Sequence, residues 1–245
     1  MTEAPLIPPD VRDKLIVALD VPTASDAQQI VEALGDAVSF YKIGLQLQFA
    51  PDGDGLRFAQ KLIEAGKSVF LDCKFLDIPE TVERAVENVA RMGARFLTVH
   101  GEAKAIAAAV RGRGHVPLRI LAVTVLTSLD AGDLKEMGFK GMSVRDLVRL
   151  RVCAALEAGA DGVIASGEEV GAIREIAGDR LKIITPGIRR SSDSVHDQKR
   201  IATPAAAIRA GADHLVVGRP ITKAADPRAV AEEILQEVAD AVAGR

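Results

Sequence analysis

The strongest constraint on the fold of this 245-residue chain is a regular alternation of short apolar runs with longer helical segments. Helix signals lie between the runs. Thr23 or Ser25 caps a helix that extends to about Leu34, Pro79 opens a helix that ends near Met92, and Asp226-Pro227 opens the last one. Strands that alternate with helices pair in parallel, because each helix returns the chain to the same end of the sheet. The apolar runs lie at residues 15–19, 38–43, 69–71, 96–99, 118–125, 159–165, 181–185 and 215–217.

Eight strand–helix units predict an α/β fold with a single domain, a (β/α)8 TIM barrel, since about 250 residues is typical of such a barrel. An open doubly wound sheet is the alternative, but no Gly-x-Gly-x-x-Gly turn follows the first run. We expect residues 13–245 to form the barrel. Residues 1–12 include Pro5, Pro8 and Pro9, and we expect a short extended arm there.

Composition narrows the class of partner to small molecules. The chain has 31 basic and 34 acidic residues, a net charge of −3 and no long block of either sign, so we expect no nucleic-acid partner. No apolar run is long enough for a signal peptide or a membrane span, so we expect no membrane partner. Cys73 and Cys153 are too few for a disulfide framework and lack metal-ligand spacing, which favours a cytoplasmic protein.

The third apolar run leads into the most informative stretch, residues 68–81. The strand-like residues 69–71 are followed by Asp72, Lys74 and Asp77. Alternation along a strand places Asp72 and Lys74 on one face, with Asp77 on the turn beyond. A lysine flanked by carboxylates stays protonated and can deliver a proton to a developing carbanion. The alternative is structural: an ion pair that caps a barrel strand, with Asp77 complementing the next helix.

Polar residues also follow several of the other predicted strands. In a parallel barrel the active site lies at the carboxyl ends of the strands, so polar residues that end separate strands meet on one rim. Such a ring is hard to explain by solubility alone and indicates a site. Its members are Asp20, Lys42, Asp72, Lys74, Thr127, Pro186 and Arg219.

Two loops after the last two strands predict a phosphate site. They are Thr185-Pro186-Gly187-Ile188-Arg189 and Gly218-Arg219-Pro220. Backbone N–H groups at Gly187 and Gly218 can approach a phosphate closely, and the Arg219 guanidinium suits one. The alternative is that the glycines only make tight turns and that Arg219 is a solvated charge. The polar residues 189–200 form a long loop, which is typical of a lid.

Together these segments resemble a known family. The run Asp72-x-Lys74-x-x-Asp77-Ile78-Pro79-x-Thr81, with Leu19-Asp20, Tyr41-Lys42-Ile43-Gly44 and the two phosphate loops, is similar to the orotidine 5'-phosphate decarboxylases over almost the whole chain. Sugar-phosphate decarboxylases and synthases of the same superfamily share the Asp-x-Lys-x-x-Asp element alone. The combination with the other segments is specific. Family members commonly have His and Asn where this chain has Leu76 and Glu80.

The resemblance implies a carboxy-lyase that converts orotidine 5'-phosphate to UMP, the last step of de novo pyrimidine nucleotide synthesis, without metal or organic cofactor. Lys74 would protonate C6 of the pyrimidine after carbon dioxide leaves, and the site would stabilise the C6 carbanion electrostatically. A homodimer with shared sites is also implied. The resemblance implies that Lys42, Asp72 and Asp77 form a charged network around Lys74, and that Asp77, Ile78 and Thr81 reach into the partner's site. It implies ribose contacts from Asp20 and Lys42 and base contacts from Thr127 and Ser128. The implied phosphate and lid contacts come from Arg189, Gln198, Gly218 and Arg219, and Pro186 is also among the implied substrate-binding residues.

Two other functions stay open. A magnesium-dependent sugar-phosphate decarboxylase or aldolase of the same superfamily would need a further carboxylate at the end of the second strand, where this chain has Lys42. A catalytically inert barrel that only binds a phosphate ligand should have lost Lys74 or a residue of the charged network around it, and Lys42, Asp72, Lys74 and Asp77 are all present.

Overall fold

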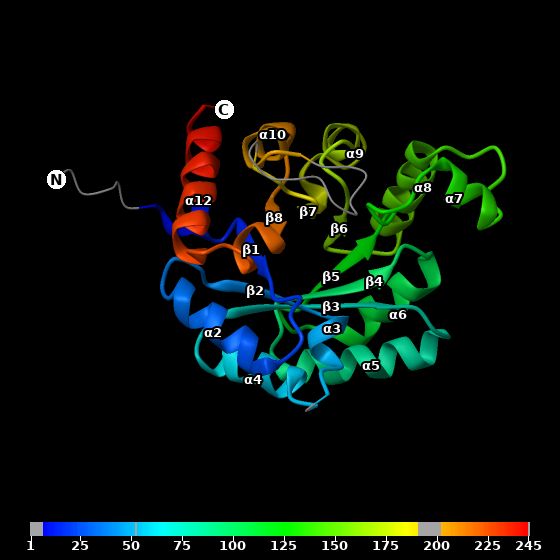
Figure 1. The fold of residues 1–245 in the computed structure, drawn as a ribbon. Helices are drawn as coiled ribbons and strands as arrows, with labels where there is room; N and C mark the ends of the chain where they lie inside the picture. The colour runs from blue at the N-terminus through cyan, green and yellow to red at the C-terminus, as the bar shows by residue number, and fades with distance from the viewer. Residues whose placement is uncertain (1–6, 52, 191–201, 245) are drawn as a thin grey trace.

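The structure, a computed structural model, describes residues 7–51, 53–190 and 202–244. Its eight strands pair in parallel and in chain order, and β8 pairs with β1 to close the barrel. Figure 1 shows the strands at the centre with helices around them. The prediction of a single-domain (β/α)8 TIM barrel is confirmed. The strands are β1 (Leu15–Ala18), β2 (Phe40–Gly44), β3 (Ser68–Phe75), β4 (Phe96–His100), β5 (Arg119–Val123), β6 (Gly162–Ile164), β7 (Lys182–Thr185) and β8 (His214–Val217).

Helices connect the strands and cover the outside of the barrel. Of the two predicted caps of α2, Thr23 has the role, because its side chain accepts a hydrogen bond from the Asp26 N–H. Within the described residues, no helix is long and apolar enough to cross a membrane. The helices are α1 (Pro9–Arg12), α2 (Ala24–Leu34), α3 (Leu45–Gln48), α4 (Gly55–Glu64), α5 (Pro79–Met92), α6 (Ala103–Arg113), α7 (Ala131–Glu136), α8 (Val144–Glu157), α9 (Val170–Ala177), α10 (Pro204–Ala210), α11 (Arg219–Thr222) and α12 (Pro227–Ala243).

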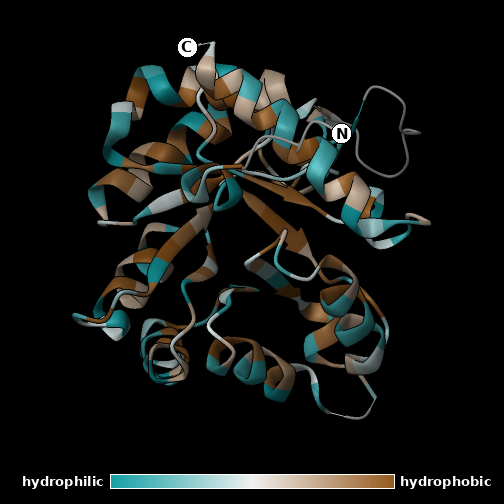
Figure 2. Ribbon diagram, turned by 90° about the vertical axis from the view of Figure 1, so that its left-hand side faces the viewer, coloured by the Kyte–Doolittle hydropathy of each residue, from teal (hydrophilic) through white to brown (hydrophobic). Residues whose placement is uncertain are grey.

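Apolar side chains fill both the inside of the barrel and the layer between strands and helices. Inside, Phe96 packs edge-on against Phe40 and Phe70, with ring centroids 5.0 and 6.0 Å apart. A larger cluster joins the outer faces of the strands to the helices. Figure 2 shows the strands largely in the brown of apolar residues, while hydrophilic residues gather on the helices. The barrel is therefore a packed core and not a pore, so a site has room only at its ends.

Some predicted boundaries are wrong for identifiable reasons. Residues 9–12 form the short helix α1 and not an extended arm, because Pro9 suits the first helical position and Val11 is buried in the core. Residues 1–6 of the predicted arm lie outside the described residues. Strand β6 begins at Gly162 and not at Gly159, which has a φ of 77° and lies in the turn after α8.

The amino end of the barrel is closed by a charged cluster on the aromatic core. The Arg95 guanidinium donates two hydrogen bonds to the Asp13 carboxylate, at 2.5 and 2.6 Å, and lies over the Phe40 ring, 4.9 Å from its centroid. The buried His214 ring donates from Nδ1 to the Asp13 carbonyl at 2.8 Å, since a carbonyl oxygen can only accept. The polar groups named here are therefore bonded to one another and rest on the aromatic core.

Two aspartates at the amino end repeat one arrangement. The Asp161 N–H donates to the Ile120 carbonyl at 3.0 Å, and the Ile120 N–H donates back to the Asp161 carboxylate at 2.8 Å. Asp213 and Ile183 exchange the same two bonds, at 2.9 and 2.8 Å. Each carboxylate also pairs with a guanidinium from the outer layer, Arg113 for Asp161 and Arg174 for Asp213. The strand pairs β5–β6 and β7–β8 therefore start in the same way.

Candidate active site

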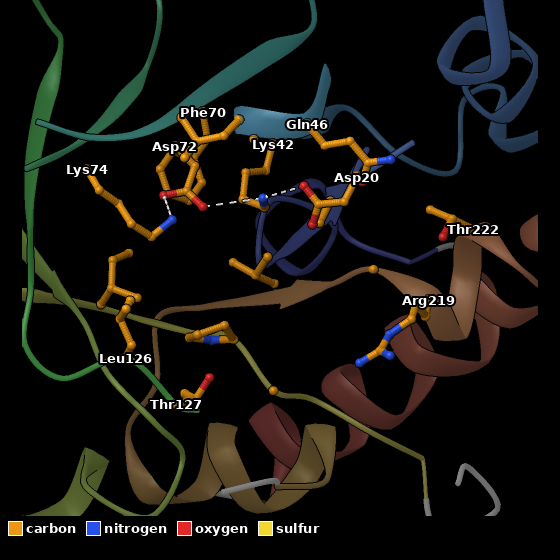
Figure 3. A pocket seen from close by; sticks show the side chains of 18 of the residues that line it. Asp20, Lys42, Gln46, Phe70, Asp72, Lys74, Leu126, Thr127, Arg219 and Thr222 are labelled. Atoms are coloured by element: carbon orange, nitrogen blue, oxygen red, sulfur yellow. Dashed lines mark hydrogen bonds and ion pairs between the residues drawn. The ribbon is translucent and has the colours of Figure 1, made fainter. Parts of the chain in front are cut away.

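A cavity of about 740 Å³ opens at the carboxyl end of the barrel, the end where the sequence predicts a site (Figure 3). Its deepest lining residues include Ala18, Phe70 and Val216, which belong to the packed interior of the barrel. The structure brings all members of the predicted polar rim together around this cavity. The lining residues from the sequence prediction are Asp20, Lys42, Asp72, Lys74, Thr127, Pro186, Gly187, Arg189, Gly218 and Arg219.

Four charged side chains from three neighbouring strands form a continuous series of ion pairs. Lys42 Nζ lies 2.9 Å from Asp20 Oδ1 and 3.3 Å from Asp72 Oδ2. Lys74 Nζ lies 2.8 Å from Asp72 Oδ1. Figure 3 shows the four side chains in a row along one side of the cavity, with negative and positive groups alternating. Each acid therefore has a lysine ammonium beside it, and the Asp72 side chain is largely shielded from solvent while that of Asp20 is half exposed.

Burial and neighbouring charges act on these groups in opposite directions. Burial acts to lower the pKa of Lys42, but the carboxylates of Asp72 and Asp20 outweigh it, and the pKa is raised. Burial acts to raise the pKa of Asp72, but the ammonium groups of Lys42 and Lys74 outweigh it and hold that pKa below its usual range. Lys42 therefore stays cationic and Asp72 anionic near neutral pH, so the cavity contains preorganised charges.

The pairing of Lys74 with Asp72 depends on a bulge in β3, not on simple strand alternation. Between the registered pairs Leu71–Leu97 and Phe75–Val99, three β3 residues lie opposite a single β4 residue. Lys74 lies in this bulge with a φ of 51°, the only positive φ of a non-glycine residue in the described parts of the chain. Such a conformation costs roughly 1–3 kcal/mol and persists only where the surroundings impose it. The predicted strand end at residue 71 is therefore wrong, since β3 continues through the bulge to Phe75.

Gly44, the last residue of β2, leaves space for the Asp20–Lys42 ion pair. A Cβ atom built on Gly44 would lie 2.4 Å from Asp20 Oδ1 and 2.8 Å from Lys42 Nζ. Both distances are shorter than nonbonded contacts allow, so any side chain at this position would displace the pair. Gly44 belongs to the Tyr41-Lys42-Ile43-Gly44 motif, but the motif alone does not predict that Gly44 makes room for the ion pair.

The other side of the cavity is built by the loops after β7 and β8. Gly187 has a φ of 78°, a conformation that favours glycine, and lies beside Pro186 in the wall. Arg219 is the first residue of α11, and Figure 3 shows its guanidinium directed into the cavity. The Arg189 side chain is buried and donates to the Ile188 carbonyl at 2.8 Å. Two guanidinium groups therefore give this side the charge that an anion requires.

Other predicted site residues do not line the cavity of this chain. Asp77 and Ile78 are exposed on the turn after β3, where the Asp77 carboxylate accepts a hydrogen bond from the Ile78 N–H at 2.6 Å. Thr81 is exposed on the first turn of α5. Ser128 is exposed, whereas its neighbour Thr127 faces the cavity. Gln198, with residues 191–200 of the predicted lid, lies outside the described residues.

Several lining residues were missed by the sequence analysis. Gln46 on α3 lies beside Asp20 in Figure 3, and Leu126 lies next to Thr127. Thr222 and Lys223 line the cavity from the end of α11. Gln46 follows the end of β2 as closely as Asp20 follows β1, so the rule about strand ends could have found it. Leu126 is apolar, so a search for polar residues at strand ends could not have found it.

The donor set does not favour a metal ion at this end of the barrel. Among residues 7–51, 53–190 and 202–244, no group of three or more His, Cys, Asp or Glu side chains is placed to hold one. The two carboxylates that could ligate magnesium, Asp20 and Asp72, already share the Lys42 ammonium between them. A divalent cation would have to displace this ammonium.

Comparison with known proteins agrees with this geometry. The family model described as Orotidine 5'-phosphate decarboxylase / HUMPS family matches residues 13–234. The orotidine 5'-phosphate decarboxylase of Nitrobacter winogradskyi is 54% identical over 231 residues, which cover 94% of this chain and 95% of that protein. Its counterpart in Methylobacterium nodulans is 52% identical over 236 residues, which cover 95% of this chain and 98% of that protein.

Solved structures show the same likeness. A crystal structure of orotidine 5'-phosphate decarboxylase from Lactobacillus acidophilus superposes with a TM-score of 0.80 at 36% identity, covering 91% of this chain and 98% of that one. Its match and those of the bacterial relatives extend over the barrel that carries the Asp20–Lys42–Asp72–Lys74 series. The chain therefore belongs to the orotidine 5'-phosphate decarboxylase / HUMPS family.

Proposed function

We propose that this protein decarboxylates orotidine 5'-phosphate to UMP, the last step of de novo pyrimidine nucleotide synthesis. The observation that carries the proposal is the Lys74 ammonium, fixed 2.8 Å from the Asp72 carboxylate on a cavity whose other side presents Arg219. The relatives at 52% and 54% identity are named orotidine 5'-phosphate decarboxylase, which supports this substrate. Residues 13–245 as the catalytic unit and a cytoplasmic location, with Cys73 and Cys153 as free thiols, are parts of the same proposal.

The reaction requires stabilisation of charge on carbon. Breaking the bond between C6 and the carboxylate releases carbon dioxide and leaves the electron pair on C6, where no carbonyl group delocalises it. The Lys74 ammonium stabilises this pair and then transfers a proton to C6, which gives UMP. The neutral Lys74 amine takes a proton from solvent to complete the cycle. Asp72 holds the ammonium in place and puts a negative charge near the substrate carboxylate, whose departure relieves the repulsion.

The rest of the cavity binds the parts of the substrate that do not react. Asp20, Lys42 and Thr127 line the cavity, and in the proposed function Asp20 and Lys42 contact the ribose hydroxyls and Thr127 the base. Arg219, Gly218 and Gly187 line the side proposed for the phosphate. Contacts far from C6 can still accelerate the reaction, because their binding energy helps to hold the pyrimidine against Lys74.

Direct observation of turnover tests the proposal. Purified protein incubated with orotidine 5'-phosphate should change the ultraviolet absorbance of the pyrimidine and release one carbon dioxide for each UMP formed. The Lys74→Ala variant serves as the matched blank. Binding of the nucleotide without release of carbon dioxide would favour the inert phosphate-binding barrel instead.

The second candidate is a magnesium-dependent sugar-phosphate decarboxylase or aldolase of the same superfamily. The Lys42 ammonium between Asp20 and Asp72 disfavours it, because magnesium would need those carboxylates. Exhaustive chelation followed by the same assay separates the two. Unchanged turnover supports the decarboxylase, whereas loss that added magnesium reverses supports the second candidate.

A homodimer with shared sites is also part of the proposal. Asp77, Ile78 and Thr81 are exposed and turned away from their own cavity, at the same end of the barrel. Apolar side chains are exposed around them, with Leu76 56% and Ile78 67% exposed, and Phe49 after α3 is 81% exposed. An exposed apolar surface of this kind is typical of an interface, and a twofold dimer would put Asp77 of one chain at the site of the other.

Mixing two inactive variants tests the shared site. Lys74→Ala and Asp77→Ala subunits that exchange at random form mixed dimers, in which one site carries both changes and the other carries neither. Activity should return to about a quarter of the wild-type level, since half of the dimers are mixed and half of their sites are intact. Native mass spectrometry monitors the exchange. Confirmed exchange without recovered activity would show that Asp77 acts within its own chain.

A further inference from the structure

Thr98, a buried residue of β4, connects the backbone and the side chains of the proposed catalytic pair. It lies between Leu97 and Val99, the two β4 residues that pair in register with Leu71 and Phe75. Thr98 is thus the β4 residue opposite the bulge that contains Asp72, Cys73 and Lys74. Its side chain has no exposed surface, so water cannot replace its hydrogen bonds.

The Thr98 hydroxyl makes two hydrogen bonds at once. It accepts from the Lys74 backbone N–H at 3.0 Å and donates to Asp72 Oδ1 at 2.8 Å. A hydroxyl has a single hydrogen, which is used toward Asp72, while its lone pairs accept from Lys74. The same Asp72 oxygen accepts from the Lys74 ammonium at 2.8 Å. The contacts close a small ring through Thr98, Asp72 and Lys74.

This ring of hydrogen bonds stabilises the unfavourable backbone conformation of Lys74 in the bulge. Lys74 has a positive φ that a residue with a side chain adopts only when its surroundings impose it. The hydroxyl holds the Lys74 backbone from one side, and the carboxylate that the hydroxyl orients holds the ammonium from the other. Without the hydroxyl, the partly buried Lys74 N–H would lose its hydrogen-bond partner.

We propose that Thr98 is a positioning residue for the decarboxylation: its hydroxyl fixes both the left-handed backbone of Lys74 and the orientation of Asp72, so that the ammonium points at C6. This inference rests on the proposed function for the chemical step, but the conformational part does not depend on any substrate. Thr98 does not line the cavity and takes no part in the bond changes.

Three variants test the role. Thr98→Val keeps the shape and removes the hydroxyl, whereas Thr98→Ser keeps the hydroxyl and removes a methyl group. The matched control is Thr124→Val, since Thr124 is also fully buried and its hydroxyl donates to the Ile164 carbonyl at 2.8 Å, away from Lys74 and Asp72. If Thr98→Val fails to fold, Thr98→Ala removes the same hydroxyl together with the γ-methyl group and adds no new atom.

We expect Thr98→Val to lower kcat by roughly 30- to 100-fold, because a small misplacement of a reacting group is enough for such a loss. KM should change less than about threefold, since the ribose and phosphate contacts remain. Thr98→Ser and Thr124→Val should stay within about threefold of wild type in both constants. Calorimetry with UMP counts the intact sites, so that misfolded protein is not mistaken for a lower kcat.

Amide hydrogen exchange in residues 72–75 supplies a readout that needs no turnover. Exchange at Lys74 should accelerate in Thr98→Val and return to the wild-type rate in Thr98→Ser, with little change elsewhere. Equal kcat in the Val and Ser variants, or an unchanged exchange rate at Lys74 in Thr98→Val, would overturn the proposal. If the wild-type chain does not decarboxylate the nucleotide, the proposed function fails, and the exchange result still decides whether Thr98 positions Lys74.

Discussion

Both ends of the barrel carry ion pairs, and the two ends use them differently. At the amino end, the Arg95 guanidinium lies between the Asp13 carboxylate and the rings of Phe40 and Phe96, so it closes the aromatic core. At the carboxyl end, Asp20, Lys42, Asp72 and Lys74 border a cavity of about 740 Å³. One set of charges rests on the aromatic core, and the other borders the large cavity at the carboxyl end.

This difference indicates that charges at one end of the barrel serve mainly stability and those at the other end serve mainly catalysis. The amino-end charges rest on ordinary backbone and on packed rings, so removing one of them should lower the free energy of unfolding. The carboxyl-end pair Asp72–Lys74 depends on a bulge and on a strained φ at Lys74, which the packed barrel maintains. Removing one of those charges should cost activity more than stability.

The largest expected effect is on Lys74, at the carboxyl end of β3. Lys74→Ala should lower kcat at least about 10⁴-fold, because it removes both the proton donor and the positive charge beside C6. The matched control is Lys67, at the amino end of the same strand, whose ammonium donates to the Gly35 and Val38 carbonyls at 3.1 and 3.0 Å. Lys67→Ala should keep kcat within about twofold and lose roughly 1–2 kcal/mol of unfolding free energy. Substantial turnover by a folded Lys74→Ala variant would rule Lys74 out as the donor.

Arg219 should show a smaller loss that depends on the substrate. Arg219→Ala should lower kcat/KM for orotidine 5'-phosphate by about 100-fold or more and barely change the slow reaction of orotidine, which has no phosphate. The exposed Arg209 of α10 offers a control of the same charge, and Arg209→Ala should leave both reactions unchanged. Equal proportional losses on the two substrates would mean that Arg219 supports the fold or the chemistry.

Arg95 tests the opposite end. Arg95→Met keeps much of the apolar stem but removes the ion pair with Asp13 and the contact with the Phe40 ring. We expect a loss of about 2 kcal/mol in unfolding free energy and a melting temperature lower by roughly 4–8 °C. Decarboxylation at 25 °C should stay within about twofold of wild type. A large loss of kcat in folded protein would break the separation between the two ends.

The last prediction concerns His214 and pH, with no change of activity expected at pH 7. Burial lowers the pKa of His214 to about 4, and Arg95 acts in the same direction against Asp13 and Asp213. The unfolded chain takes up this proton near pH 6.5, whereas the folded chain resists until about pH 4, so stability is full above pH 6.5 and falls through that window. The loss attributable to His214 is at most about 3 kcal/mol.

A variant isolates this contribution. His214→Gln keeps a hydrogen-bond donor for the Asp13 carbonyl and does not titrate. Urea unfolding between pH 7 and pH 4 should show a smaller loss of stability in His214→Gln than in wild type, with equal turnover at pH 7. Identical pH dependence in the two proteins would show that His214 does not titrate in this window.

Much of the fold could be predicted because periodic apolar runs and helix caps are local. Thr23 and Asp226 cap helices by accepting a hydrogen bond from an N–H three residues on, and Pro79 suits the first helical position; the structure has helices at all three. The rim could be predicted for a related reason. Once the strands are parallel, the residues at their carboxyl ends must meet, so Asp20, Lys42 and Arg219 could be assigned to one site without coordinates.

The features that were missed depend on contacts between distant segments. The bulge in β3 exists because β4 pairs with it in a shifted register, and nothing within residues 68–81 specifies that shift. In the sequence, nothing distinguishes Thr98 from any other strand residue. Its role depends on the bulge that lies opposite it in the β3–β4 pairing. The need for glycine at residue 44 likewise arises from Asp20, which belongs to another strand end. A short helix such as α1 is missed because its prolines are equally typical of an extended arm.

The repeated aspartates Asp161 and Asp213 have a consequence for how the chain reaches its native topology. Closing the barrel joins β1 to β8, with Leu15 paired to Leu215, and a single closure over so long a segment is slow. Each aspartate binds the preceding strand through both its own N–H and its carboxylate, so the parallel pairs β5–β6 and β7–β8 can form locally, before the whole barrel closes. The β1–β8 pairing that closes the barrel then forms between strand pairs that are already assembled. The conformational entropy of the chain is therefore lost in several short steps and not in one long loop closure.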